Sequence, residues 1–305
     1  MNIMTVSPAP HIHDGITTRR IMLDVIIALC PALITGIVIF GRRAALVAGV
    51  CITACVLCEW IFRKALNRKN TVTDLSAALT GLLLALNLPV SIPIWQVVFG
   101  CIVAIVLVKQ LFGGLGKNFA NPAITARIVM FLAFASSMTN WVMPFDTVTG
   151  ATPLMLMARG DADALPGLRD LFLGLHGGCI GETSELALLL GGIYLLCRKV
   201  ISWHTPAAFI GVVFVMTALL GMHPVQQIFS GGLMLGAIFM ATDYVTTPYT
   251  KSGRLIFGAG AGLITVLIRV YGSYPEGVSF GILFMNMLVS YINRLTAKKA
   301  LGGIF

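Results

Sequence analysis

The feature that most constrains this chain is a series of apolar stretches, each about 20 residues long, that recur along nearly its whole length. A helix of that length crosses the hydrocarbon core of a bilayer, which is about 30 Å thick. The stretches do not alternate with a period of two, as the strands of a membrane barrel do. Of the 305 residues, 57% are hydrophobic and 11% are charged, against about 25% charged in ordinary soluble domains. We therefore expect an all-α integral membrane protein.

The apolar stretches predict about ten membrane helices in two sets of five. The third helix of each set is short and broken: the first ends at Asn87-Leu88-Pro89, and the second runs into ATDYVTTPYTKSGR. Because five is an odd number, the second set must enter the membrane upside down relative to the first. This is the pattern of an inverted repeat, in which broken helices frame a ligand or ion site near the midplane. The expected spans are 21–40, 44–62, 75–88, 94–112, 122–137, 185–197, 205–222, 227–241, 255–270 and 278–293.

The basic residues predict the orientation of these helices. If the N-terminus is cytoplasmic, the inner loops carry most of the arginines and lysines, whereas the outer loops carry only Arg42, Arg43, Arg159 and Arg169, with Arg269 nearby. The net charge of +9 therefore fits the positive-inside rule, and we expect no nucleic-acid partner. The first twenty residues are polar, so we expect no cleavable signal peptide. The expected segments are a cytoplasmic N-terminal segment (1–20), a first five-helix repeat (21–137), an extracytoplasmic loop (138–184), a second five-helix repeat (185–293) and a cytoplasmic tail (294–305).

Three of the seven cysteines, Cys51, Cys55 and Cys58, have the C-x3-C-x2-C spacing of one class of iron–sulfur site. They lie within an expected helix, where a rise of about 1.5 Å per residue spreads them over about 10 Å of one stripe. One compact cluster is not easily held by ligands so far apart on a straight helix, so we favour a packing face of small residues. Nothing near His11 and His13 completes a metal-ligand set, and we assign the histidines no role.

Ionisable residues within or beside the expected spans are better candidates for function, because burying them in lipid is costly. Arg127 lies about a turn and a half into the helix that begins at Pro122, and Asp243 follows the second broken span. We expect Arg127 to contact an anion and Asp243 to serve as an ion or proton site. For the three acidic residues near the inner boundary we favour pairing with basic neighbours such as Arg20 and Arg63. These three are Asp24, Glu59 and Asp74.

The longest polar stretch contains the run DTVTGATPL, residues 146–154. Pro153 suits the first turn of a helix and Thr152 suits its N-cap, so the following LMLMARG is expected to form a short amphipathic helix at the outer interface. A phosphate on the Thr152 oxygen would lie beside free N–H groups. The small residues Gly150 and Ala151 would leave room for an enzyme or a bulky group to approach this hydroxyl. The residues alone favour an ordinary N-cap.

The segment DTVTGAT, from Asp146 to Thr152, resembles the flavinylation motif Asp-x-x-Ser/Thr-Gly-Ala-Thr, in which FMN is joined to the final threonine by a phosphoester bond. Four further stretches, at 17–32, 109–127, 230–246 and 253–286, are similar in the same order to the D subunits of the Rnf complexes, and more distantly to the B subunits of the sodium-pumping NADH:quinone reductases. The chain is identified as a member of this family over nearly its full length. Ala120 and Tyr244 depart from the residues usual there, which are phenylalanine and proline.

The resemblance implies a multi-pass subunit of an ion-motive electron-transport complex in the bacterial cytoplasmic membrane, coupling reduced ferredoxin and NAD to transport of sodium ions or protons. FMN would be attached to Thr152, with Asp146, Thr149, Gly150 and Ala151 completing the motif. A second flavin, riboflavin or FMN, would be held noncovalently between the helices, with Arg127 as a contact.

The same resemblance implies partners. They would be the A, B, C, E and G subunits of an Rnf complex, above all the flavin-bearing G subunit, together with a flavin transferase for maturation and the lipid bilayer. The sequence contains neither an NAD-binding glycine fingerprint nor a cluster-binding cysteine set, so we expect those cofactors on partner subunits.

Two other classes of function remain open at this point. Ten helices in inverted halves also describe solute channels and permeases without a redox role. An assembly scaffold that has lost its flavin is a third possibility. Covalent flavin on Thr152 distinguishes the redox subunit from both.

Overall fold

The computed structural model describes residues 17–145, 148–161, 164–182, 184–272 and 276–297, and in these ranges the regular secondary structure is helical apart from one isolated bridge between Val142 and Thr149. The N-terminal half contains α1 (Thr18–Phe40), α2 (Arg42–Ala65), η1 (Val72–Asp74), α3 (Ser76–Leu86), α4 (Ile94–Ile102), the π-helix η2 (Val103–Gln110), α5 (Pro122–Ala133) and α6 (Ala135–Met138). The short helices α7 (Pro153–Arg159) and α8 (Leu168–Leu173) follow. The C-terminal half contains α9 (Glu185–Cys197), α10 (His204–Leu219), α11 (Pro224–Ile228), α12 (Leu233–Leu235), the π-helix η4 (Gly236–Met240), α13 (Lys251–Tyr271) and α14 (Val278–Thr296).

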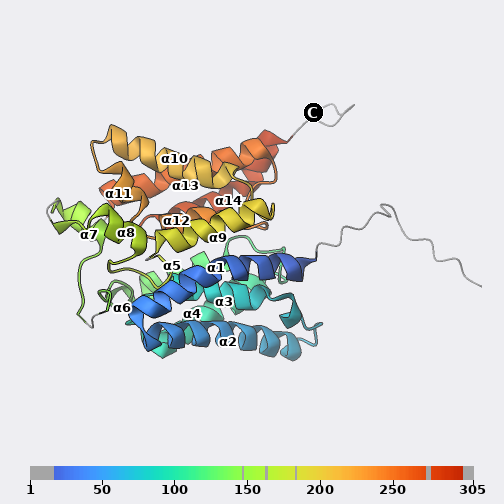
Figure 1. Ribbon diagram of the computed structural model, residues 1–305. Helices are drawn as coiled ribbons and strands as arrows, with labels where there is room; N and C mark the ends of the chain where they lie inside the picture. Colours follow the sequence, from blue (N-terminus) through green and yellow to red (C-terminus); the bar gives the residue numbers. More distant parts are fainter. Residues whose placement is uncertain (1–16, 146–147, 162–163, 183, 273–275, 298–305) are drawn as a thin grey trace, which may run out of the picture.

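The two halves of the chain form two packed layers of helices (Figure 1). Between them, α1 packs against α9 and α5 packs against α14. Within each layer, α2 packs on α3 and α10 packs on α13. The close approach of α3 to α2 requires a residue without a side chain, because a Cβ added at Gly81 would lie 2.7 Å from the carbonyl oxygen of Cys51.

The fold is that of a multi-pass helical membrane protein. Among the described helices, α1, α2, α13 and α14 are long and apolar enough to cross a bilayer on their own, and five shorter apolar helices accompany them. Large apolar side chains face outward from the bundle, such as Leu132, which is 71% exposed, and Leu219, which is 77% exposed. Such surfaces suit contact with the hydrocarbon chains of lipid, which form no hydrogen bonds.

Helices occupy the positions of all ten expected apolar stretches, and several of these helices are interrupted. The fourth span begins as an α-helix and finishes as the π-helix η2, and the fifth is interrupted at Phe134. The second broken span consists of three short pieces, α11, α12 and η4. Its glycine-rich break at Ser230-Gly231-Gly232 contains Gly231 at a φ of +63°, a conformation that costs glycine little.

The two ends of the bundle carry different elements. The segment with α6, α7 and α8 lies at one end, which we call the α7 end, and the beginning of α1 and the end of α14 lie at the other, the terminal end (Figure 1). The cysteine stripe lies in the middle of the continuous helix α2, with Cys51 and Cys55 fully buried and Cys58 partly buried. All three are free thiols, and Cys101 of α4 packs beside Cys51.

Candidate functional site

Thr152 forms the N-cap of α7, as its sequence predicted. Its backbone is extended, its Oγ1 accepts a hydrogen bond from the backbone N–H of Met155 at 3.3 Å, and Pro153 occupies the first turn. Gly160, in the left-handed conformation, ends the helix. The Thr152 side chain is only 4% exposed, so the hydroxyl is covered by its surroundings.

A short hairpin leads into this cap. Val142 and Thr149 pair as a single antiparallel bridge, and the Gly150 N–H donates to the Trp141 carbonyl at 3.0 Å. A Cβ added at Gly150 would lie 2.6 Å from the sulfur of Met143. The absence of a side chain at Gly150 therefore lets the Met143 side chain pack against the motif. Asp146, the first residue of the motif, lies outside the described residues.

Arg127 lies in α5 and joins the two halves of the protein. Its Nη2 lies 2.6 Å from Oε2 of Glu276, just before α14, and its Nη1 donates to Oδ1 of Asn87 at 2.9 Å and to Oγ of Ser279 at 3.3 Å. The side chain of Arg127 is 5% exposed. Its guanidinium is therefore held by protein groups at the end of α3 and at the beginning of α14.

The Arg127 site and the Thr152 helix share one small hollow. This hollow is lined by Arg127, Leu154, Gly231, Gly232, Arg269, Glu276, Val278 and Ser279. Leu154, the second residue of α7, is 3% exposed and packs against Gly231. Two candidate residues that sequence analysis treated separately thus belong to the same region at the α7 end.

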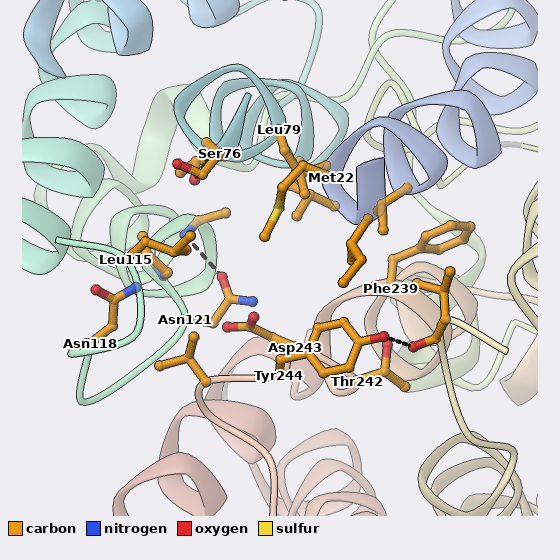
Figure 2. Close-up of a pocket in the computed structure, with 18 of the residues that line it drawn as sticks. Met22, Ser76, Leu79, Leu115, Asn118, Asn121, Phe239, Thr242, Asp243 and Tyr244 are labelled. Carbon is orange, nitrogen blue, oxygen red and sulfur yellow. Dashed lines mark hydrogen bonds between the residues drawn. The ribbon is translucent and has the colours of Figure 1, made fainter. Parts of the chain in front are cut away.

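Asp243 lines a different and larger pocket, between the halves and closer to the terminal end (Figure 2). Its Oδ2 accepts a hydrogen bond from Oγ1 of Thr246 at 3.1 Å. The carboxylate lies next to the amide of Asn121, which caps α5 by accepting from the Ala123 N–H at 3.0 Å. The walls come from α1, α3, η2, the turn before α5, α9 and the segment after η4. Both polar and apolar side chains line the pocket. The polar lining residues include Ser76, Thr80, Lys109, Asn118, Asn121, Thr242, Asp243 and Tyr244, and the apolar ones include Met22, Leu79, Leu83 and Phe239.

The pocket contains polar atoms that the protein leaves unpaired. Oδ1 of Asn118 is buried and has no hydrogen-bond partner among the described residues. By contrast, Lys109 is 1% exposed and its Nζ lies 2.6 Å from both Oε2 of Glu59 and Oγ of Ser76. Lys109 belongs to the π-helix η2, whose altered turn changes the direction of its last side chains.

The acidic residues near the terminal end have some of the expected partners and some others. Glu59 pairs mainly with Lys109, while Arg63 lies 3.9 Å away. Asp24 pairs with Arg198 from the other half at 3.2 Å, and the expected pairing with Arg20 is not seen among the described residues. Asp74 accepts hydrogen bonds from the backbone N–H and the hydroxyl of Ser76. Pairing with basic residues is thus confirmed for Glu59, which includes the expected Arg63, and for Asp24, whose partner Arg198 is distant in sequence, whereas the described contacts of Asp74 are with Ser76.

The sequence assigned no functional role to several charged residues that are buried in the structure. Glu182 is 3% exposed, Glu185 is 1% exposed and Arg269 is 6% exposed. The signal available for them was their position: Glu182 and Glu185 precede an apolar run, and Arg269 lies near the end of an expected span. That signal alone does not distinguish an interfacial charge from a buried one.

The fold and these sites define a class: a multi-pass helical membrane protein whose ionisable side chains converge between two packed halves. The chain belongs to the NQR2, RnfD, RnfE family, whose model matches residues 5–302. The resemblance to the D subunits of the Rnf complexes is thereby confirmed.

Relatives match along nearly the whole chain. The chain is 46% identical over 303 residues to the D subunit of the Na(+)-translocating ferredoxin:NAD(+) oxidoreductase complex of Acetobacterium woodii, covering 98% of this chain and 95% of the relative. It is 40% identical over 322 residues to the D subunit of the proton-translocating ferredoxin:NAD(+) oxidoreductase complex of Clostridium ljungdahlii, covering 99% and 97%. It is 34% identical over 348 residues to the D subunit of an ion-translocating oxidoreductase complex of Yersinia pseudotuberculosis, covering 98% of both.

Proposed function

We propose that this protein is the flavin-bearing membrane subunit of an Rnf-type complex that transfers electrons between ferredoxin and NAD and couples this transfer to movement of sodium ions or protons. The observation that carries the proposal is full-length similarity to the D subunits of such complexes together with the motif that ends in Thr152. The A, B, C, E and G subunits of the complex are the proposed partners, with the G subunit as the nearest electron-transfer partner. A flavin transferase is proposed for maturation.

FMN is proposed to be joined through its phosphate to the Thr152 oxygen. The local structure fits in part: the residue is a threonine at a helix start, preceded by the small residues Gly150 and Ala151. Thr152 is only 4% exposed. Attachment of FMN therefore requires this segment to open, or it takes place before the hairpin closes. When bound, FMN supplies one- and two-electron chemistry. The protein contributes the covalent anchor, and Arg127 beside Leu154 is the proposed anion contact.

The second flavin is proposed to bind noncovalently in the pocket that Asp243 lines. Apolar walls such as Leu79 and Phe239 suit a flat ring system, and the unpaired Oδ1 of Asn118 and the amide of Asn121 suit its polar edge. This pocket fits a flavin better than the Arg127 hollow, because the donors of Arg127 are already engaged by Glu276, Asn87 and Ser279.

The membrane arrangement is proposed to follow the positive-inside rule. The terminal end would face the cytoplasm and the α7 end, with Thr152, would face outward. Support comes from the common placement of the inner-loop residues: the loops after α2, η2 and α9 lie at the same end as both described chain ends (Figure 1). Two inverted five-helix repeats are also proposed, because this placement of the loops fits them. Asp243 is the proposed ion or proton site.

The test compares Thr152→Ala and Thr152→Asn with the unchanged chain, each produced beside a flavin transferase. Asparagine is a good N-cap but has no hydroxyl to esterify, so Thr152→Asn separates loss of the cap from loss of the attachment point. We expect in-gel flavin fluorescence of the denatured chain to disappear in both variants. An unmodified mass of the unchanged chain from a flavinylation-competent host would contradict the proposal and favour a permease. Unchanged electron transfer in flavin-free variants would favour a scaffold.

A further inference from the structure

Five charged side chains from four segments lie near one another at the α7 end. Arg127 comes from α5, Glu182 precedes α9, Glu185 is the first residue of α9, Arg269 comes from α13, and Glu276 precedes α14. We call them the five-charge cluster. Glu182 interacts electrostatically with each of the other four. The cluster therefore acts as one electrostatic unit.

The two arginines leave two of the three carboxylates without an ion pair. Arg127 pairs with Glu276 at 2.6 Å. Arg269 instead donates to neutral acceptors: its Nη1 lies 2.6 Å from the Gln227 carbonyl, and its Nη2 lies 2.9 Å from the Ser230 carbonyl. Neither Glu182 nor Glu185 has an ion pair within 4.0 Å among the described residues.

Unpaired oxygen atoms remain at this place. Oε2 of Glu182 and Oε2 of Glu185 are buried and lack hydrogen-bond partners in the described part of the chain. Oγ of Ser230, on a residue with 0% exposure, is also unpaired there. A Cβ built at Gly232 would lie 3.6 Å from the free oxygen of Glu182, so this carboxylate faces the glycine break that begins at Ser230. Three buried oxygen atoms near the glycine break and the start of α9 thus lack a hydrogen-bond donor in the described part of the chain.

The charges of the cluster do not balance. Three carboxylates face two guanidinium groups, which leaves one excess negative charge. Two further titratable groups that interact with Glu182 in the described structure are His176 and Cys179. Burial lowers the pKa of the His176 imidazole against the opposing effects of the Gly177 carbonyl and Glu182, so this histidine is neutral near pH 7. Cys179 donates its thiol proton to the Asn87 carbonyl. Neither residue supplies the missing positive charge.

We propose that Glu182 and Glu185, with the hydroxyl of Ser230, form a binding site for one monovalent cation, a proton or a sodium ion. An ionised carboxylate that is buried without a partner is strongly unfavourable, and either cation would remove that cost. Oxygen ligands suit a hard cation, and paired carboxylates also share a proton readily. The site lies at the α7 end and is separate from Asp243. It does not depend on the proposed flavin chemistry, since binding uses only residues of this chain.

Size supports a small occupant. A Cβ at Gly178 would lie 3.2 Å from Oε1 of Glu182, so the carboxylate is closely surrounded on that side. Gly232 brings the backbone near the free oxygen of Glu182 without a side chain in the way. Such a site admits a bare ion or a proton and excludes an organic ligand.

The experiment uses the purified complex that contains this chain, with Glu182→Gln and Glu185→Gln as test variants. Asp161→Asn, which changes an exposed carboxylate at the same end, is the matched control. Thermal unfolding is followed in sodium chloride and in choline chloride, and infrared spectra are recorded for the carbonyl band of protonated carboxyl groups. Glutamine keeps the shape and removes the charge, so the variants resemble the neutralised site.

Two results would support the site and identify its occupant. Sodium binding gives a saturable, sodium-specific rise in Tm that both test variants lose and Asp161→Asn keeps. Proton binding gives no sodium effect, but a protonated-carboxyl band near neutral pH that at least one test variant lacks. The proposal is overturned if the unchanged complex shows neither feature, or if both variants retain it.

Two controls keep the result interpretable. If Glu182→Gln does not assemble, the unchanged complex and Glu185→Gln still decide the matter. The same response must also persist in flavin-free Thr152→Asn, which separates failure of this site from failure of the proposed flavin function.

Discussion

Nζ of Lys109 lies 2.6 Å from Oε2 of Glu59, although Lys109 is 1% exposed and Glu59 is 0% exposed. The same nitrogen donates to Ser76 at the beginning of α3, the broken third helix of the first half. In the second half, Arg269 lies near the end of α13 and donates to Gln227 and Ser230, where the corresponding broken segment starts. In each half, a buried cation near the end of the fourth span thus anchors the start of the third. This correspondence supports the proposed inverted repeat.

Lys109→Met is expected to destabilise the protein markedly, because Glu59 would remain buried without its ion-pair partner. Breaking a buried pair on one side costs about 3–5 kcal/mol. The measurement is the Tm of the purified protein in detergent. Lys109→Met combined with Glu59→Gln should recover much of the loss, since no uncompensated charge remains. Equal Tm values for the single and double variants would show that the pair itself contributes little.

Gly150→Ala is expected to reduce flavin attachment at Thr152, because its Cβ would lie 2.6 Å from the Met143 sulfur. Met143→Ala in the same chain should restore attachment, since it removes the atom that is in the way. Flavin fluorescence per chain after denaturation measures both. If attachment stays low in the double variant, the glycine is needed for access by the transferase and not for packing against Met143.

Asp243→Asn is expected to impair ion transport more than flavin attachment. Asparagine retains an oxygen that can accept the hydrogen bond from Thr246, now at 3.1 Å, so the local structure should survive while the charge is lost. Ion uptake into vesicles that contain the complex, with and without sodium, is compared with covalent flavin content. Parallel loss of uptake and flavin would indicate misfolding and remove the support for an ion site.

Arg127→Ala is expected to lower Tm and to leave the noncovalent flavin bound, because Arg127 does not line the pocket proposed for that flavin. The Tm should fall because Arg127→Ala removes a partner that lies 2.6 Å from Glu276. For a fully buried pair, breaking it on one side lowers the free energy of unfolding by about 3–5 kcal/mol. Adding Glu276→Gln should restore part of the Tm. Flavin per protein after gel filtration is measured on the same samples. We expect the flavin content of both variants to equal that of the unchanged chain, and a flavin loss that persists in the double variant would place the noncovalent flavin at Arg127 instead.

The sequence by itself determined the positions of the helices and several of their ends. Apolar runs of membrane-spanning length were enough, because a backbone in lipid must satisfy its hydrogen bonds within the same segment. Local chemistry also placed the N-cap at Thr152 and the start of α5 at Pro122, since caps depend on residues only a few positions apart. The motif that ends in Thr152, together with the four ordered similar stretches, was enough to indicate the family.

Only the tertiary structure decided which charges meet. Arg127 and Glu276 are 149 residues apart, Asp24 pairs with Arg198 across 174 residues, and Lys109 reaches Glu59 across 50. The pairing of Asp24 with Arg20 expected from the sequence fails because the packing of α1 on α9 brings Arg198 nearer. Glu182 and Glu185 show the same limit. Their lack of an ion pair within 4.0 Å among the described residues depends on where Arg269 directs its donors, which is a property of helix packing and not of any local pattern.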